Sequence, residues 1–564
     1  MNPLDQQRPE TIVSAFTALA RSHPGRLALA IQRESWRFGK RYDEVSAGEL
    51  ERDANTFAAA LEHHGIQKGM RTVVMIPPGR EFCAAIFALL KLGAPPVLID
   101  PGIGLRNLRF AIQQIRPEAF LGIHKAELAR RILGWGRDSI RISLTLESLW
   151  GRPMGHHSSV AEGGHAKPAP GDLAAIAFTS GSTGSPKGVA FDHGNLCAQA
   201  DLLKELLGPR AEGPHLVTFP LLLIFAPVLG VTAVLPRMDP SRPSAASPKR
   251  LMTASNDYGC RSAFISPALV RKLAAYCRDT ASRFSTMERI FSAGAPTDPD
   301  VLATFEPWIA PGGEIFTPYG ATEALAVSNI GSREILTQTR QETRRGAGVC
   351  VGRPLRGIAA AIIPISDQAI QDWGTVPVLA PGEIGEITVS GRVVSREYFN
   401  DSEATKRAKI RRSGVNSGPD SFWHRMGDLG YFDDVGRLWM CGRKSHRVVT
   451  AARIYFTVSA EGVFNGHPEV SRTALVGIDG AKTVPVLCVE LAARKSAGAK
   501  RRITKELRAL GASCEQTREI RHFLYHGRFP VDIRHNAKIR REELAVWAAK
   551  KMGIRKPKAE ERTT

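Results

Sequence analysis

Cysteine is scarce in this sequence, and its spacing shows no pattern. Eight cysteines are scattered over 564 residues, without a Cys-X-X-Cys pair or any spacing typical of a metal site. A disulfide framework and a structural zinc module are therefore not predicted, and reduced structural thiols are expected. The N-terminal residues MNPLDQQRPETIVSAF also lack the basic stretch and apolar core of a signal peptide. Both observations predict a cytoplasmic protein.

A Walker A loop is missing, although a glycine-rich loop is present. Residues 178–189 read FTSGSTGSPKGV, and bare backbone N–H groups in such a loop can converge on a phosphate. A Walker A loop needs Gly directly before its Lys and Ser or Thr directly after it, whereas Pro186 precedes Lys187 and Gly188 follows it. A P-loop NTPase is therefore excluded, and a different phosphate-binding chemistry is indicated.

Charge is absent from one long stretch, residues 216–236. LVTFPLLLIFAPVLGVTAVLP has 21 uncharged residues, enough to cross a bilayer. Pro220, Pro227 and Gly230 interrupt it, which is typical of a strand, a turn and a buried helix. We expect a buried wall around an apolar ligand and no integral membrane insertion, while peripheral membrane contact stays open.

Acidic residues are too few to balance the basic ones, and the imbalance is uneven. The net charge is +21, and residues 445–564 hold 24 Lys and Arg against 12 Asp and Glu. No helix-turn-helix or zinc-finger pattern accompanies this charge, and few aromatic residues lie among the basic ones. We therefore expect a solvated basic face that attracts an anionic nucleotide, and no nucleic-acid partner.

The length predicts two or more domains. Apolar patterns predict helices over 47–65 and 81–93 and strands over 71–77, 94–100 and 173–178. This βαβ order predicts a parallel sheet covered by helices. From about residue 346 short strands and turns predominate, and a smaller basic α/β domain is expected after residues 442–448.

Six motifs follow one another along the chain. They are FTSGSTGSPKGV (178–189), FSAGAP (291–296), YGATE (319–323), WHRMGD (423–428), GRKSHRV (442–448) and NAKIRR (536–541). Together they resemble the adenylate-forming superfamily of acyl-CoA synthetases, luciferases and adenylation domains, over nearly the whole chain. The resemblance implies an α/β fold. A large AMP-binding domain, residues 1–442, would contain doubly wound sheets and a β-barrel-like subdomain, and residues 443–564 would form a small mobile α+β domain.

The resemblance also implies ATP and Mg²⁺ as cofactors and assigns roles to residues of these motifs. Phosphate contacts would come from Thr179, Ser180, Gly181, Ser182, Thr183, Gly184 and Lys187. Adenine would lie between Gly294-Ala295-Pro296 and Tyr319-Gly320, because small side chains and an aromatic face suit a flat base.

The remaining roles concern the reacting groups. Thr322 would contact the α-phosphate, and Glu323 would hold Mg²⁺, a hard cation that prefers oxygen ligands. Asp428 would accept hydrogen bonds from both ribose hydroxyls, with Arg443 beside it. Lys538 would bridge the carboxylate and the α-phosphate as the catalytic lysine.

Three departures from the superfamily pattern narrow the substrate. Leu221, Leu222 and Leu223 follow Pro220, where relatives often have His or an aromatic residue, so a long acyl chain is favoured. Ser445 replaces the usual charged hinge residue. The stretch VVTAARIYF (448–456) lacks the glycine past which pantetheine runs in acyl-CoA synthetases, which puts thioester formation in doubt.

Three further stretches look like the olefin β-lactone synthetases of bacterial long-chain hydrocarbon biosynthesis. They are ALLKLGAPPVLIDPGIG (88–104), YGATEALAVS (319–328) and FPVDIRHNAKIRR (529–541). This resemblance implies a long-chain 2-alkyl-3-hydroxyalkanoic acid as substrate, activated through an acyl-AMP, with other enzymes of the same pathway as partners. The β-hydroxyl would then displace AMP. Asp532 and His535 are candidates for its general base, and a structural hydrogen-bonding role is the alternative.

Other functions stay open at this point. A long-chain acyl-CoA or acyl-AMP ligase would share every motif except the backbone-exposing glycine. A pseudo-enzyme is disfavoured because Lys187, Glu323, Asp428 and Lys538 are all present.

Overall fold

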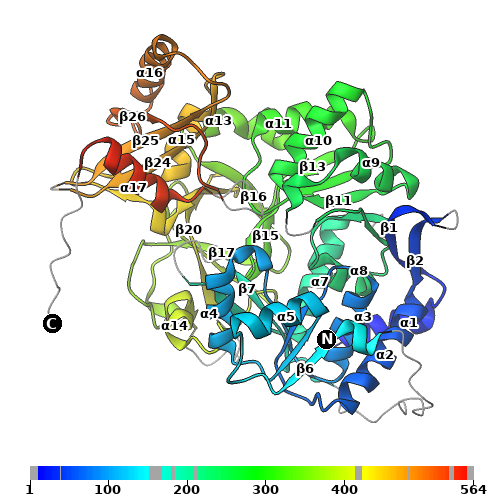
Figure 1. Ribbon diagram of the computed structural model, residues 1–564. Helices are drawn as coiled ribbons and strands as arrows, with labels where there is room; N and C mark the ends of the chain where they lie inside the picture. The colour runs from blue at the N-terminus through cyan, green and yellow to red at the C-terminus, as the bar shows by residue number, and fades with distance from the viewer. Residues whose placement is uncertain are drawn as a thin grey trace.

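A computed structural model describes most of the chain. The described stretches are residues 10–37, 40–150, 168–179, 185–208, 212–239, 242–412, 422–480, 482–531 and 539–554. Figure 1 shows two sheets with helices over their faces in the first two thirds of the chain, then a third sheet, and a smaller C-terminal part at the upper left.

The first sheet has six strands in the order β6-β5-β3-β4-β7-β8. Its strands are β3 (Thr72–Met75), β4 (Pro96–Leu98), β5 (Ala119–Gly122), β6 (Ile142–Thr145), β7 (Leu173–Thr179) and β8 (Lys187–Asp192). All pairs are parallel except β7 with β8. The helices that follow its strands are α3 (Arg80–Lys91), α4 (Leu105–Ile115), α5 (His124–Leu133) and α7 (His193–Leu207). The βαβ pattern predicted from the sequence is confirmed.

The charge-free stretch 216–236 belongs to a second, seven-stranded sheet of order β13-β12-β11-β9-β10-β1-β2. Its strands are β1 (Leu27–Arg37), β2 (Lys40–Ser46), β9 (His215–Val217), β10 (Ala233–Leu235), β11 (Ser262–Ile265), β12 (Arg289–Ser292) and β13 (Glu314–Phe316). Between β9 and β10 the chain forms the short buried helix α8 (Leu222–Leu229), which ends at Gly230 in a left-handed conformation. The predicted strand, turn and buried helix are confirmed. No helix among the described residues combines the length and apolar character needed to cross a membrane.

The third sheet is antiparallel and corresponds to the expected β-barrel-like subdomain. Its strands are β14 (Tyr319–Ala321), β15 (Ala324–Asn329), β16 (Val349–Pro354), β17 (Ala359–Ile363), β18 (Gly385–Ser390), β19 (Lys409–Arg411), β20 (Phe422–Phe432) and β21 (Leu438–Arg443). The motifs YGATE, WHRMGD and the start of GRKSHRV all lie on it. A single sheet therefore holds three of the six motifs.

The C-terminal part is small and has the expected α+β character. A hairpin of β22 (Val448–Val449) and β23 (Ile454–Tyr455) precedes a three-stranded sheet. That sheet contains β24 (Val470–Ile478), β25 (Val484–Leu491) and β26 (His522–Tyr525), with helices α15 (Thr457–Asn465), α16 (Ala497–Ala512) and α17 (Arg541–Lys551).

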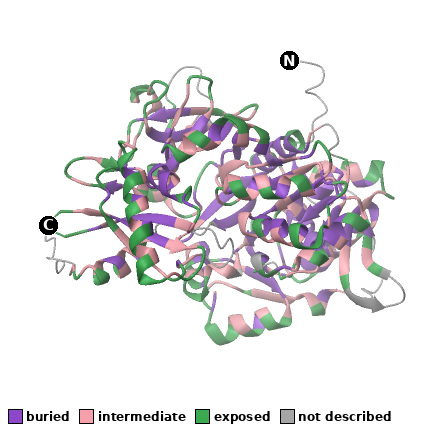
Figure 2. Cartoon of the chain, turned by 90° about the horizontal axis from the view of Figure 1, so that it is seen from above, coloured by how far each residue is buried: buried purple, intermediate pink, exposed green. Residues whose placement is uncertain are grey.

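The apolar core explains how the first two sheets pack. One cluster joins α3, of which residues 82–90 are all buried, with α7, α8 and strands of both sheets. Figure 2 shows the buried residues concentrated along the sheets and the exposed ones on the outer helices. Burying these faces gives the main favourable free energy of folding, and it brings the ends of the strands of both sheets to one cavity.

Candidate active site

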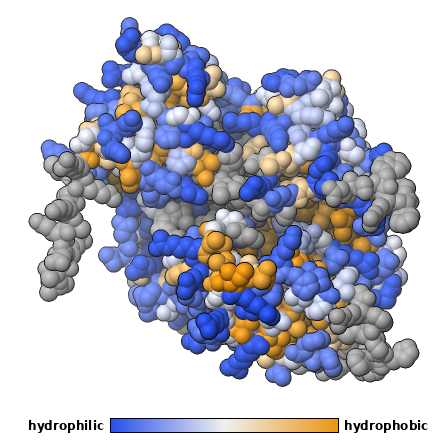
Figure 3. All heavy atoms as spheres, viewed as in Figure 1, coloured by the Kyte–Doolittle hydropathy of each residue, from blue (hydrophilic) through white to orange (hydrophobic). Residues whose placement is uncertain are grey.

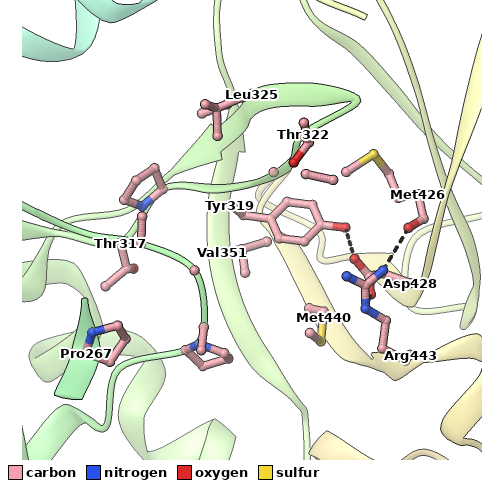
Figure 4. Close-up of a pocket in the computed structure, with 18 of the residues that line it drawn as sticks. Pro267, Thr317, Tyr319, Thr322, Leu325, Val351, Met426, Asp428, Met440 and Arg443 are labelled. Carbon is pink, nitrogen blue, oxygen red and sulfur yellow. Dashed lines mark hydrogen bonds and ion pairs between the residues drawn. The ribbon is translucent and has the colours of Figure 1, made fainter. Parts of the chain in front are cut away.

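A polar cluster of Tyr319, Asp428 and Arg443 lies on the wall of a cavity of about 1870 Å³. The Tyr319 hydroxyl donates to Asp428 Oδ2 over 2.8 Å, and Arg443 Nε lies 3.1 Å from Asp428 Oδ1. Arg443 Nη1 also donates to the Met426 carbonyl over 3.1 Å. Figure 4 shows the tyrosine ring and the guanidinium converging on the carboxylate from two sides. The cluster therefore brings together the motifs YGATE, WHRMGD and GRKSHRV.

The register of two strands accounts for this meeting. β20 and β21 form an antiparallel pair in which Asp428 lies opposite Arg443. Asp428 is only 3% exposed, and a buried carboxylate needs such partners. The Asp428 carboxylate raises the pKa of Arg443, and burial together with the same carboxylate raises the pKa of Tyr319. Tyr319 is thus a neutral donor and Arg443 a fixed cation.

The segment after β12 forms the wall expected to take the adenine. Gly294, Ala295 and Pro296 line the same cavity as Tyr319, and Gly294 has a φ of +98°, which favours glycine. Ser292 Oγ and Thr297 Oγ1 lie 2.7 Å apart and brace the turn. At Gly320 a Cβ would lie 2.6 Å from the Ala324 carbonyl oxygen, so only glycine fits there.

Tyr398, which no sequence motif singled out, contacts both Glu323 and Lys187. Tyr398 donates its hydroxyl to Glu323 Oε1 over 2.7 Å, and Lys187 Nζ lies 4.8 Å from the centroid of its ring. Burial and then the Glu323 carboxylate raise the pKa of Tyr398, so it stays a donor. Thr322 precedes Glu323 in the turn between β14 and β15 and lines the cavity. No local sequence pattern points to Tyr398.

Two buried basic side chains were also missed. Lys409 is 8% exposed, donates to Ser395, and burial lowers its pKa to about 7. His424 is 2% exposed and lines the cavity, and burial followed by the Lys409 charge holds its pKa well below the usual value. A period of two along β20 would not have found His424, because Gly427 is left-handed and the register of β20 with β18 shifts there.

Several predicted residues lie outside the described part of the chain. They are the Thr179 side chain, Ser180, Gly181, Ser182, Thr183, Gly184, Asp532, His535 and Lys538. Residues that flank them are described and line the cavity: Ser185 and Lys187 after the glycine-rich loop, and Ile539 and Arg540 directly after Lys538 within NAKIRR. The roles of the nine residues stay predictions.

The residues behind the three departures have different surroundings. Ser445 lines the cavity, whereas Ala451 and Ala452 are exposed at the turn between β22 and β23. In this arrangement the two alanines do not face the cavity, and their effect on pantetheine stays a prediction.

Apolar side chains from both parallel sheets and their helices line the rest of the cavity. They include Ile86, Leu90, Leu98, Leu196, Leu203, Leu206, Leu222, Phe225 and Phe264. Stretch 216–236 contributes Leu222 and Phe225, so its predicted place on an apolar wall is confirmed.

The side chains around Glu323 fit a metal ion that is held mainly by phosphates. Among the described residues, no group of three or more His, Cys, Asp and Glu side chains is placed to hold a metal. Glu323 is a single carboxylate, and both it and Lys187, the residue expected to bind phosphates, contact Tyr398. This fits Mg²⁺, which commonly binds through one or two carboxylates plus substrate phosphates and water.

Comparisons with known proteins agree with the fold. A family model described as AMP-binding enzyme matches residues 16–399. The amide bond synthetase McbA from Marinactinospora thermotolerans shares the fold at a TM-score of 0.75 and 22% identity, covering 95% of this chain and 99% of McbA. The Bacillus subtilis enzyme MenE, in a complex with ATP and magnesium ion, shares the fold at a TM-score of 0.73 and 20% identity. The match covers 94% of this chain and 98% of MenE. The chain belongs to the AMP-binding, adenylate-forming family of AMP-forming ligases.

Curated relatives narrow this class. The olefin beta-lactone synthetase of Xanthomonas campestris pv. campestris is 44% identical over 95% of this chain and 97% of its own length. The enzyme of the same name from Stenotrophomonas maltophilia is 44% identical over 96% of this chain and 98% of its own length. The chain is therefore a homologue of the olefin β-lactone synthetases, and the resemblance read from its sequence is confirmed.

Proposed function

We propose that this chain uses ATP to convert a long-chain 2-alkyl-3-hydroxyalkanoic acid into a β-lactone, releasing AMP and pyrophosphate. The observation that carries the proposal is one cavity in which the Tyr319–Asp428–Arg443 cluster and an apolar wall occur together. The 44% identity to two olefin β-lactone synthetases supports the choice of substrate and product.

The chain's residues serve the first step as follows. The substrate carboxylate attacks the α-phosphorus, the bond to the pyrophosphate oxygen breaks, and an acyl-AMP forms. Asp428 accepts from the ribose hydroxyls, and Tyr319 offers its ring to adenine across from Gly294-Ala295-Pro296. Lys538 bridges the reacting oxygens, and Lys187 with the 178–189 loop neutralises the departing pyrophosphate. Glu323 would hold Mg²⁺, which neutralises phosphate charge when bound.

Ring closure needs no second substrate. The β-hydroxyl oxygen attacks the acyl carbonyl carbon, the carbon–oxygen bond to AMP breaks, and the hydroxyl proton leaves to a base. Well-aligned intramolecular groups reach effective molarities of about 10⁵ M or more, although ring strain reduces the benefit here. Asp532 and His535, near Lys538 in sequence, are the proposed sources of the base.

The setting of the reaction is also part of the proposal. We assign residues 1–442 to the nucleotide-binding domain and residues 443–564 to a mobile domain that brings Lys538 to the cavity. We also propose that the protein acts in the cytoplasm, together with enzymes that make the hydroxy acid and enzymes that consume the lactone.

Product analysis tests this function. The protein is incubated with a 2-alkyl-3-hydroxy acid, ATP and Mg²⁺, with and without CoA, and products are identified by NMR and infrared spectroscopy. A lactone with AMP and pyrophosphate, unaffected by CoA, is expected, and the matched acid without its hydroxyl should stop at retained acyl-AMP. A CoA thioester formed from either acid would make this an acyl-CoA ligase instead.

A further inference from the structure

Helices α4 and α5 expose a group of large apolar side chains. Leu105, Phe110, Leu128, Ile132 and Leu133 are 41–73% exposed. They are five of the twelve exposed large apolar residues among the described residues, within a span of 29 positions. Apolar residues exposed singly are ordinary, whereas a group of this size marks an interaction surface. We call these five residues the α4–α5 patch.

The two helices lie on the same face of the first sheet. α4 leads from β4 to β5 and α5 from β5 to β6, so both crossovers run in one direction along the order β6-β5-β3-β4. Right-handed parallel crossovers in one direction place their helices on one face. Figure 1 shows α4 and α5 side by side toward the viewer, and Figure 3 shows apolar and hydrophilic side chains interleaved over them.

The charge around the patch has one dominant sign. The exposed basic residues between positions 105 and 141 are Arg106, Arg109, Arg116, Lys125, Arg131, Arg137 and Arg141. Asp138 is the one exposed acidic residue in that range. Glu127 is buried and paired with both Arg130 and Arg131, so these three residues together carry one net positive charge. The patch is therefore apolar with a basic surround.

The same segment also forms part of the cavity wall. Gly102, Ile103 and Asn107 line the cavity, while Leu105 and Phe110 face solvent. Asn107 Nδ2 donates to the Ile103 carbonyl over 3.0 Å, which fixes the start of α4. One short stretch thus separates an apolar surface from a cavity with an apolar wall.

We propose that the α4–α5 patch docks the protein reversibly on an anionic lipid surface, from which long-chain substrate enters the cavity. The chemistry fits because apolar side chains on a helix face insert at the acyl boundary, while Lys and Arg remain at anionic headgroups. The proposal goes beyond the reaction itself and does not depend on which product is made.

Vesicle flotation tests the docking. Full-length protein is mixed with vesicles of phosphatidylglycerol and phosphatidylcholine or of phosphatidylcholine alone, at low and high salt. Wild type should float with anionic vesicles and release at high salt. Arg106→Glu/Arg109→Glu should lower partitioning at least about 25-fold, since each basic residue near an anionic surface contributes about fivefold. Ile132→Glu should lower it about tenfold or more.

Matched variants elsewhere control for net charge and for loss of apolar surface. Arg501→Glu/Lys505→Glu on α16 makes the same charge change, and Val378→Glu replaces another exposed apolar residue, 58% exposed. Both should float like wild type. With substrate carried in vesicles, the patch variants should raise the apparent KM, while turnover of a short, water-soluble hydroxy acid should be unchanged.

The opposite results overturn the proposal. Wild type that stays with the solvent fraction, or patch and control variants that lose binding equally, would exclude docking through α4 and α5. Self-association in sedimentation velocity that Ile132→Glu abolishes, with vesicle binding unchanged, would assign the patch to a second copy. If the proposed lactone reaction itself were wrong, no lactone would form from the short soluble acid even without vesicles. That result is separate from a failure of membrane docking.

Discussion

Lys538 is the residue on which the first half-reaction should depend. If it bridges the carboxylate and the α-phosphate, Lys538→Ala removes a contact made in the transition state and leaves ATP binding intact. The expected loss is about 3 kcal/mol or more, around a hundredfold in rate. Pyrophosphate release measures the rate and calorimetry measures ATP affinity, with Lys550→Ala, an exposed lysine on α17, as control. Wild-type pyrophosphate release by Lys538→Ala would refute its assignment.

Glu323 should determine the Mg²⁺ requirement. Glu323→Gln keeps the shape and removes the charge, so half-saturating Mg²⁺ should rise. Tyr398→Phe keeps the ring beside Lys187 and removes only the 2.7 Å hydrogen bond that orients Glu323. Loss of an orienting partner typically weakens metal binding about tenfold, so this variant should shift the Mg²⁺ titration less. Titration of ATP binding against Mg²⁺ checks both. Unchanged titrations would place the metal on phosphates alone.

His193 should make stability depend on pH. It is 1% exposed at the start of α7, and burial lowers its pKa from 6.5 to about 4, opposed by Asp172. Between these values the unfolded chain binds a proton that the folded chain does not, so stability is full above pH 6.5 and falls toward pH 4. The loss in the free energy of unfolding from this one histidine, on going from above pH 6.5 to below pH 4, is about 3 kcal/mol. His193→Gln should lose less stability than wild type between pH 7 and 4.5 in urea unfolding, and an equal loss in both proteins would contradict the assignment.

At the scale of elements, α8 should set the acyl specificity. Leu222 lines the cavity and is partly buried, so Leu222→Asp should weaken long-chain acids and spare ATP. Each buried methylene contributes about 0.8 kcal/mol of binding free energy. The loss of kcat/KM in the variant should therefore grow about fourfold per methylene until the acyl chain is longer than the apolar wall. kcat/KM across a chain-length series measures this, with Leu222→Met as the volume-matched control. An equal loss of kcat/KM for acids of every length would show that the acyl chain binds away from α8.

The elements show what sequence alone could predict. The path of 216–236 was predictable because Pro220 and Gly230 interrupt it: α8 begins at Leu222, two residues after Pro220, and ends at Leu229, with Gly230 as its C-cap. The meeting of Asp428 with Arg443 was predictable only through the family resemblance. Contact between Tyr398 and Glu323 was not predictable, because it depends on packing between segments 75 residues apart that share no local pattern.

At the scale of the whole molecule, the small C-terminal part contacts the rest of the chain at several places: α15 packs against α13 (Arg340–Arg344), β16 and β21, and the connection before it is tied to the antiparallel sheet through Lys444. Lys444 Nζ donates to the Ser366 carbonyl over 2.6 Å and lies 3.2 Å from Glu386, which also pairs with the buried Arg425. Ser445 follows directly and lines the cavity, so the mobility that we propose for residues 443–564 would require the contacts of α15 with α13 and β21 to open.

The central claim is that the substrate's own hydroxyl displaces AMP from an acyl adenylate, and oxygen labelling tests it most directly. With ¹⁸O in the β-hydroxyl, mass spectrometry should find the label in the lactone ring and none in AMP. With ¹⁸O in the carboxylate, one labelled oxygen should appear in AMP and one in the lactone carbonyl. Label passing from the hydroxyl to AMP, with both carboxylate oxygens kept in the lactone, would show that the hydroxyl is the group activated and would contradict the account.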